Sequence, residues 1–146
     1  MELFVKEFAE LTVGELYEIL KLRAEVFVVE QNCPYQDLDD EDNGALHIWL
    51  DDKGKLAAYL RIIKIDSETV KIGRVIAAKR RCGLGTQVLK AGITVAKERY
   101  GAKAIQIHAQ TYAKEFYEKQ GFIQTSEEFL EVGIPHIGME LTFQEI

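Results

Sequence analysis

Hydrophobic positions follow two spacings along the chain, and each spacing predicts its own kind of element. Alternation of hydrophobic and polar residues is typical of half-buried strands, whereas recurrence every three or four positions is typical of amphipathic helices. The helical spacing runs over 13–27, after the capping-box pattern Thr12-x-x-Glu15. The helical spacing recurs in a second segment, which follows a glycine turn and ends with Gly101 as its C-cap. It recurs in a third segment over 113–120. The expected strands are 3–8, 46–50, 56–65, 69–78, 104–109, 122–130 and 136–143.

The order of these elements predicts the class of the fold. It is a strand, a helix, a three-strand meander, a helix, a strand that we expect to be buried, a short helix and two strands. Between the first helix and the meander, the polar, acid-rich segment 28–44 is expected to be irregular. A chain of 146 residues without repeats or linkers predicts one domain, 1–146. We therefore expect an α/β (α+β) protein with a single mixed sheet flanked by helices.

Composition and charge exclude several classes of protein. The chain is 47% hydrophobic and 29% charged, as soluble globular proteins are, and its net charge of −6 argues against a nucleic-acid or membrane surface. No apolar run approaches the roughly 18 residues that span a bilayer, and the N-terminus lacks a signal-peptide pattern. Cys33 and Cys82 form no CxxC motif, which favours a reducing, cytoplasmic location. No metal is expected, since the calcium-loop-like stretch from Asp39 has Leu50 where an acid is required.

The most informative stretch is Arg80-Arg81-Cys82-Gly83-Leu84-Gly85-Thr86, which lies between a strand and a helix. This order leaves backbone N–H groups without partners at the positive end of a helix dipole, where a phosphate group fits. Gly83 and Gly85 allow close approach of the backbone, and the two arginines add charge-assisted contacts. Ordinary turn chemistry can use the same residues, so the stretch alone leaves both interpretations open.

Two other phosphate motifs are excluded. A dinucleotide fingerprint needs a further glycine where Val88 stands, and a P-loop needs lysine and a hydroxyl residue where Thr86-Gln87 stand.

A second motif follows one strand later, as Ala113-x-x-Phe116-Tyr117-Glu118-Lys119-x-Gly121-Phe122. Together with Arg80-x-x-Gly83-x-Gly85 it resembles, in order and spacing, the paired motifs of the GNAT superfamily of N-acetyltransferases. The resemblance covers essentially the whole chain. Two further stretches, Leu22-Arg23-x-x-Val26-Phe27-x-x-Glu30-Gln31 and Gly133-Ile134-Pro135-His136, resemble the ElaA-like branch. The segment before Arg80 is shorter than is usual there, and Arg81 replaces a glycine, which leaves open which backbone amides face the cofactor.

The resemblance implies an acetyl-CoA-dependent N-acetyltransferase that passes the acetyl group to a primary amine of a small molecule or peptide by direct attack. By this resemblance, the backbone amides near Ile76 and Ala77 would hold the pantetheine arm in a slot beside the strand at 104–109, and would polarise the thioester. The implied cofactor-binding residues are Val75, Ile76, Ala77, Arg80, Arg81, Gly83, Leu84, Gly85, Thr86, Ala113 and Phe116.

Tyr117 is the candidate general acid. A phenol with a pKa near ~10 can give a proton to a thiolate whose conjugate acid has a pKa near ~8.5–9. The alternative is that Phe116 and Tyr117 are both core aromatics of a short helix.

An amine acceptor needs a group that removes its proton, and Glu30 is the candidate base, with His136 as its rival. Gln31 could position the acceptor. Glu30 could equally be a solvated acid at a helix end, and His136 a hairpin residue. We expect His47 and His108, on strands, to be satisfied core or surface histidines.

The acids of the segment 37–42 could attract a cationic acceptor, although a solvated loop is the favoured interpretation. Cys82 lies beside a helix N-terminus, but no neighbouring histidine supports an acetyl-cysteine role. The alternative function is a non-catalytic acyl-CoA-binding or sensor module that uses the same turn. The sequence does not identify the acceptor, nor does it decide whether the chain forms the homodimer that is common in the family.

Overall fold

The computed structural model describes residues 1–79 and 82–143. Its helices are α1 (Val13–Arg23), α2 (Leu84–Tyr100) and α3 (Lys114–Glu118), with the π-helical turn η2 (Ala24–Glu30) directly after α1. Single 3-10 turns occur at Phe8–Glu10, Asp42–Gly44 and Thr111–Ala113. The strands are β1 (Glu2–Glu7), β2 (Leu46–Asp52), β3 (Lys55–Lys64), β4 (Thr69–Ala77), β5 (Ala104–Gln110), β6 (Ile123–Gln124), β7 (Phe129–Glu131) and β8 (Ile134–Thr142).

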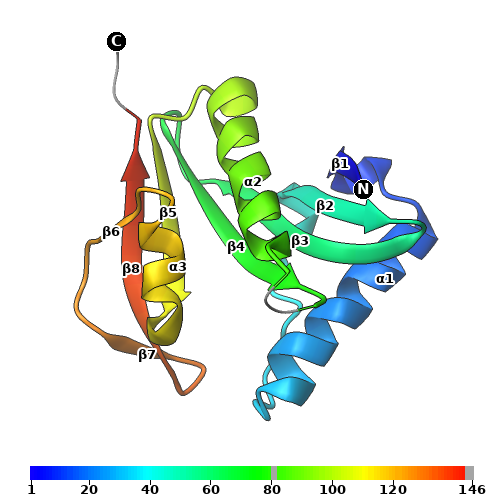
Figure 1. Ribbon diagram of the computed structural model, residues 1–146, viewed down its shortest axis with the longest axis horizontal. Coiled ribbons are helices and arrows are strands. Elements are labelled where there is room, and N and C mark those ends of the chain that lie inside the picture. Colours follow the sequence, from blue (N-terminus) through cyan, green and yellow to red (C-terminus); the bar gives the residue numbers. More distant parts are fainter. Residues whose placement is uncertain (80–81, 144–146) are drawn as a thin grey trace.

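The strands form one mixed sheet in the order β1-β2-β3-β4-β5-β8-β6, and β7 also pairs with β8 (Figure 1). Neighbours from β1 to β4 run antiparallel, β4 and β5 run parallel, and β8 lies antiparallel to β5. The predicted α/β class, with a mixed sheet flanked by helices, is confirmed.

Each face of the sheet has its own hydrophobic core, because alternate residues of a strand point to opposite faces. Leu60 of β3 packs with Val88 and Leu89 of α2, whereas its neighbour Tyr59 packs with Ile19 of α1. Helix α2 lies close to the sheet at Gly92, where a Cβ atom would stand 2.8 Å from the Leu60 Cδ2 atom. The two helices therefore cover opposite faces of the same strands.

The predicted start of α1 and end of α2 are confirmed. The Thr12 hydroxyl accepts from the Glu15 backbone N–H at 3.0 Å, and the Glu15 carboxylate accepts from the Thr12 N–H at 2.9 Å. Gly101 ends α2 with φ at +59°. The helix expected over 13–27 is present, but it changes from α-helix to wider π-helical turns at Ala24 and continues to Glu30.

Strands β4 and β5 separate soon after they meet. They pair from Thr69–Ala104 to Lys71–Gln106, and the described residues beyond that point have no register pairs between these two strands. The register of β4 against β3 shifts between Tyr59 and Arg61, where β4 carries one extra residue and Arg74 has φ at +55°. This β-bulge turns the end of β4 away from a regular ladder, as the expected slot requires.

The C-terminal part of the sheet differs from the expected two-strand hairpin. The continuous strand expected over 122–130 is wrong, because β6 and β7 are separate short strands joined by the segment 125–128. This segment lies against β8, where the Gly138 N–H donates to the Ser126 hydroxyl at 2.8 Å. A Cβ atom on Gly138 would stand 3.0 Å from that hydroxyl oxygen, so a side chain there would displace the segment.

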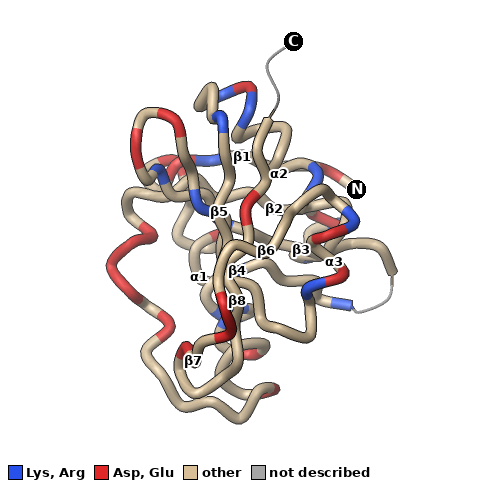
Figure 2. The backbone as a smooth tube through the Cα atoms, turned by 90° about the vertical axis from the view of Figure 1, so that its left-hand side faces the viewer, with Lys and Arg blue, Asp and Glu red and all other residues tan. Residues whose placement is uncertain are grey.

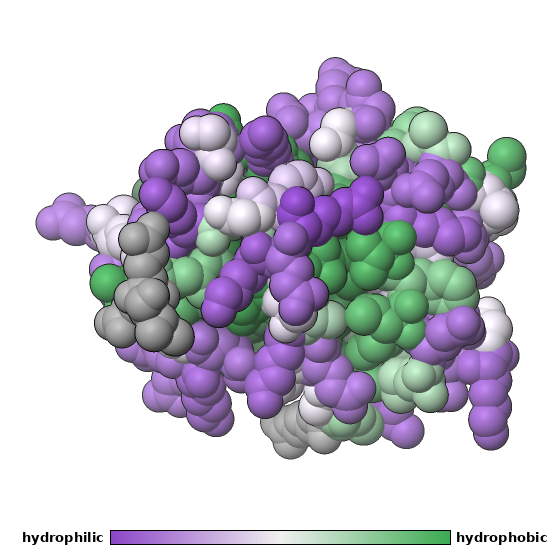
Figure 3. Space-filling view, turned by 90° about the horizontal axis from the view of Figure 1, so that it is seen from above, coloured by the Kyte–Doolittle hydropathy of each residue, from purple (hydrophilic) through white to green (hydrophobic). Residues whose placement is uncertain are grey.

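The surface agrees with the composition. Acidic and basic residues both occur on many turns and strand ends (Figure 2), and hydrophilic side chains make up most of the face seen from above (Figure 3). Among the helices of the described residues, none has the length and apolar character needed to cross a membrane.

Candidate functional site

The N-terminus of α2 carries the features expected of an anion site. Gly83 occupies the N-cap position with φ at +74°, no side chain caps the first turn, and that turn holds no acidic residue. The first backbone N–H groups of a helix lack intrahelical acceptors, so here they are available to a negatively charged ligand. Arg80 and Arg81 lie outside the described residues, so their predicted contacts are not part of this geometry.

The two sequence motifs meet in space. A Cβ atom on Gly85 would lie 3.4 Å from the Phe116 ring and 4.0 Å from the Ala77 Cβ atom. The start of α2, the end of β4 and helix α3 therefore border one another. Most other residues predicted to bind the cofactor lie in this region: Leu84 is buried, Val75 and Ala113 pack against the α2-side core, and Thr86 is half-buried in the first turn. Ile76 instead belongs to the α1-side core.

Tyr117 lies on α3 with 9% of its surface exposed. Its ring packs edge-on against Phe116 at 5.0 Å and Phe122 at 5.8 Å, between ring centroids. Burial raises the pKa of its phenol, so the group keeps its proton at neutral pH. The aromatic packing that we weighed as the alternative to catalysis is thus present, and the role of Tyr117 as an acid stays a prediction.

The exit from α1 lies against the end of β5 and the β7–β8 turn. The Gln31 amide oxygen accepts from the Gln110 amide at 3.3 Å, and the Cys33 thiol donates to the Val132 carbonyl at 3.3 Å. His136 is the register partner of Gln110 in β8. Two of the predicted acceptor-side residues, Gln31 and His136, are therefore brought to the same end of the sheet. Glu30 is exposed at the end of η2.

A carboxylate that sequence reasoning did not single out joins two histidines. The His136 Nδ1–H donates to the Ile134 carbonyl at 2.7 Å, and its Nε2 lies 3.6 Å from one Glu131 oxygen. The other Glu131 oxygen lies 3.0 Å from Nδ1 of His108. The sequence signal for an exposed His108 is the alternation of β5. Ile105, Ile107 and Ala109 are buried, whereas Gln106 and His108 are exposed. The expectation of a buried strand at 104–109 is therefore wrong for Gln106 and His108, and it gave no reason to look for a partner of His108.

The acidic segment 37–42 is not the solvated loop that we favoured. Arg23, with 0% of its surface exposed, donates to Asp37 at 2.9 Å and to Asp42 at 2.6 Å. Arg61 donates to the same Asp42 oxygen at 2.9 Å and also pairs with Asp39. Burial acts to raise the pKa of Asp42, but the hydrogen bonds from Arg23 and Arg61 outweigh it and lower that pKa. These three acids are paired with arginines, so they offer little free negative charge to an acceptor.

The segment 37–42 also contacts the β4 bulge, through Arg74. The Arg74 Nε–H donates to Asp37 at 2.8 Å, and an Nη2–H donates to the Asp37 carbonyl at 3.1 Å. The Tyr35 hydroxyl donates to the same Asp37 carboxylate at 2.8 Å, and burial together with this bond raises the pKa of Tyr35 to about 12. A positive φ costs a non-glycine residue roughly 1–2 kcal/mol, and these contacts offset that cost at Arg74.

His47 is a satisfied core histidine, as expected. Its Nε2 lies 2.9 Å from the Asp42 carbonyl, which can only accept, so Nε2 carries the proton. Its Nδ1 then accepts from the Tyr59 hydroxyl at 2.7 Å. Burial lowers the pKa of His47, which favours this neutral form.

Comparison with known proteins decides the family. A model of the acetyltransferase (GNAT) domain matches residues 12–143. The chain belongs to the GNAT acetyltransferase family. Among GNAT relatives, protein ElaA of Escherichia coli (strain K12) is 42% identical over 139 residues, with 90% of each chain covered. Among the described residues, no group of three or more His, Cys, Asp or Glu side chains could hold a metal ion.

Solved structures agree with the GNAT assignment. The crystal structure of Escherichia coli ElaA matches with a TM-score of 0.90 at 40% identity, over 96% of this chain and 98% of that one. An acyl-CoA N-acyltransferase from Pseudomonas aeruginosa matches with a TM-score of 0.90 at 37% identity, over 97% and 100%. An aminoglycoside 6'-N-acetyltransferase in complex with coenzyme A shares the GNAT fold at a TM-score of 0.73 and 15% identity, over 95% and 96% of the two chains.

Proposed function

We propose that this GNAT protein is an acetyl-CoA-dependent N-acetyltransferase that acts on a primary amine. The observation that carries the proposal is the contact between the two motifs, where Gly85 at the start of α2 lies against Phe116 of α3 beside the separated ends of β4 and β5. In this proposal the contact brings the residues that would bind the pyrophosphate next to a slot for the pantetheine arm. The family membership and the acyl-CoA N-acyltransferase of similar structure support the same chemistry.

In this proposal the uncapped first turn of α2 binds the pyrophosphate, with Gly83, Leu84, Gly85 and Thr86 as its backbone donors. Arg80 and Arg81 would add charge-assisted contacts. The backbone N–H groups of β4 near Ile76 and Ala77 would hold the pantetheine arm and polarise the thioester carbonyl. Acetyl-CoA supplies the activated acyl group, and the chain's own residues bind it, orient it and move protons.

Tyr117 is proposed to protonate the departing thiolate. The raised pKa of its phenol keeps the proton in place until the thiolate forms, and its position between Phe116 and Phe122 fixes the ring. A second candidate function, an acyl-CoA sensor without turnover, is favoured by that same burial among core aromatics. The two functions differ in whether an amine releases the thiol.

The first experiment compares Gly83→Val with Gly54→Val. Both glycines have positive φ and no heavy atom within 4 Å of a built Cβ, so the two variants carry similar backbone strain. We expect coenzyme A to raise the melting temperature of wild type and Gly54→Val but not of Gly83→Val, because the side chain at 83 would obstruct the anion site. Thiol release from acetyl-CoA is then measured over a panel of primary amines.

Equal stabilisation of both variants by coenzyme A would disprove the anion site. Stabilisation of the wild type without thiol release for any amine would instead favour the sensor.

The second experiment replaces Tyr117 with phenylalanine, which keeps the ring and removes the hydroxyl. We expect kcat to fall by about 10- to 1000-fold with little change in coenzyme A binding, since only a proton transfer is lost. Tyr17→Phe, at an exposed position on α1, is the matched control and should keep full activity. Wild-type turnover of Tyr117→Phe, with chemistry shown to limit the rate, would make Tyr117 a core aromatic.

A further inference from the structure

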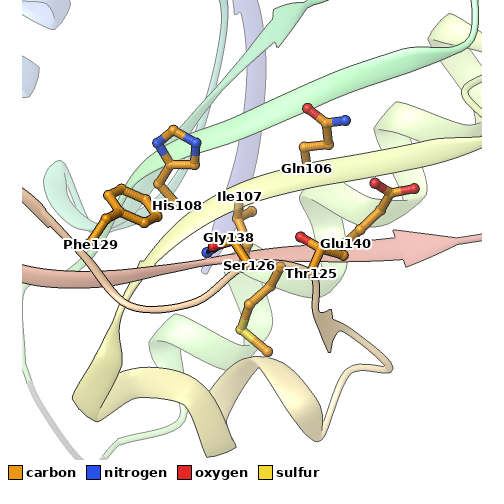
Figure 4. A pocket seen from close by; sticks show the side chains of 9 residues that line it. Gln106, Ile107, His108, Thr125, Ser126, Phe129, Gly138 and Glu140 are labelled. Atoms are coloured by element: carbon orange, nitrogen blue, oxygen red, sulfur yellow. Dashed lines mark hydrogen bonds between the residues drawn. The ribbon is translucent and has the colours of Figure 1, made fainter.

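A pocket of about 300 Å³ opens between β5, β8 and the segment 125–129. His108 and Phe129 lie together at one end, and Gln106 and Glu140 lie at the other (Figure 4). The hydroxyls of Thr125 and Ser126 line its side. Its lining therefore combines an aromatic ring, an imidazole, an acid and small hydrogen-bonding groups, which suits a cationic amine that carries polar groups.

The pocket borders the place where the sheet separates. His108 stands two residues beyond Gln106, the last residue of β5 that pairs with β4. Its side chain shares a sheet face with Gln106 and Gln110, opposite the face on which Ile105 and Ile107 pack with α2. A cofactor held at the start of α2 would thus reach the slot from one face, and an acceptor in the pocket would reach it from the other.

Glu131 fixes the proton on the His108 ring. The carboxylate can only accept at neutral pH, so the 3.0 Å contact places the hydrogen on Nδ1 and leaves a lone pair on Nε2. The Phe129 ring meets the imidazole edge-on at 5.2 Å between centroids and limits its rotation. Lys71 of β4 lies further away, with 3.5 Å between Nζ and Nδ1, and the contact with the carboxylate is the shorter of the two.

Resting on the function proposed above, we propose that this pocket binds the cationic amine acceptor and that His108, positioned by Glu131, accepts its proton. The acceptor's ammonium loses one proton to Nε2 of His108, which later passes it to solvent. The freed nitrogen lone pair forms the C–N bond to the thioester carbonyl carbon, and the C–S bond then breaks. The thiolate takes a proton from Tyr117, and the surplus proton on the nitrogen restores the phenol.

The test is the pH dependence of kcat/KM for the full chain, with the best amine from a panel that includes a linear diamine, lysine and an amino sugar. His108→Asn keeps a donor near the Nδ1 position and removes the lone pair of Nε2. We expect kcat/KM to fall by about 100-fold or more near pH 7, and the loss to shrink at high pH, where free amine is abundant. Coenzyme A should still raise its melting temperature as in wild type.

Glu131→Gln tests the positioning role, and Glu30→Gln is the matched comparison for the base that the sequence favoured. The charged and titratable groups that face His108 are Lys71, Glu131 and, through Glu131, His136. We expect Glu131→Gln to lower kcat/KM by about 10-fold and to change the shape of the acidic limb, with partial rescue in Glu131→Asp. If His108 is the base, Glu30→Gln should lose less kcat/KM near pH 7 than His108→Asn does.

An active wild type with an equally active His108→Asn variant overturns the role of His108 and leaves the acetyltransferase function standing. A wild type that binds coenzyme A but acetylates no amine overturns both. A 100-fold loss in Glu30→Gln, with His108→Asn unaffected, would return the role of base to Glu30.

Discussion

Two acidic regions of this protein differ in whether arginines neutralise their carboxylates. In the segment 37–42, arginines from α1, β3 and β4 surround Asp37, Asp39 and Asp42. At β7 and β8, Glu131 contacts two histidines and remains 45% exposed in its side chain, and Glu140 lines an open pocket. In Figure 2 the backbone beside the β7 label carries acidic residues, drawn in red. A run of acids in a sequence therefore does not indicate free negative charge, because distant partners decide whether that charge is available.

The largest effect is expected where the charges are buried. Arg23→Ala would remove a buried partner from both Asp37 and Asp42, so we expect the free energy of unfolding to fall by about 3–5 kcal/mol. Arg99→Ala, which breaks an exposed pair with Glu7, should cost less than about 1 kcal/mol. Glu131→Gln, in the other acidic region, should also cost less than about 1 kcal/mol.

Urea denaturation of the three variants measures this difference. If Arg23→Ala lost no more stability than Arg99→Ala, the buried ion pairs of Arg23 would contribute no more to the free energy of unfolding than an exposed pair does.

A smaller effect is expected in the pH dependence of stability. The pKa of His47 is lowered in the folded state by burial, so the unfolded chain binds a proton first as pH falls below about 6.5. Stability is therefore fully present above that pH and is lost below it, by at most about 1.4 kcal/mol per pH unit for one proton. The lowered pKa of Asp42 adds a second loss below about pH 4.

The measurement is the free energy of unfolding from pH 8 to pH 3, for wild type and His47→Gln. The variant should be less stable at pH 8, because its hydrogen bonds to Tyr59 and Asp42 change, but it should lack the loss that begins below about 6.5. The same slope in both proteins would mean that another group takes up the proton.

Local signals predicted much of the fold. The capping box at Thr12, the C-cap at Gly101 and the glycine turn before α2 all depend on residues a few positions apart. The bulge at Arg74 could not be predicted in this way, because its ion pair with Asp37 joins residues 37 positions apart in the chain. The break between β6 and β7 likewise depends on how Ser126 contacts Gly138.

The sequence predicted some parts of the candidate site and missed others, for the same reason. The glycine turn before α2 and Phe116 carry short motifs, and the structure brings them together at Gly85. The pairing of His108 with Glu131 joins β5 to β7, and each residue alone is an ordinary strand residue. The alternation of β5 could have indicated that His108 faces away from the α2-side core, but it could not have supplied its partner.

The early separation of β4 and β5 gives this sheet two free edges in its interior. A free edge is a template that another chain's strand can extend, and bulges are one way in which proteins prevent this. The bulge at Arg74 lies on one of these edges and is tied by Asp37 to a buried group of charges, so the edge cannot straighten without breaking ion pairs. The bulge that accompanies the separation of β4 and β5 therefore also hinders another strand from pairing along the same edge.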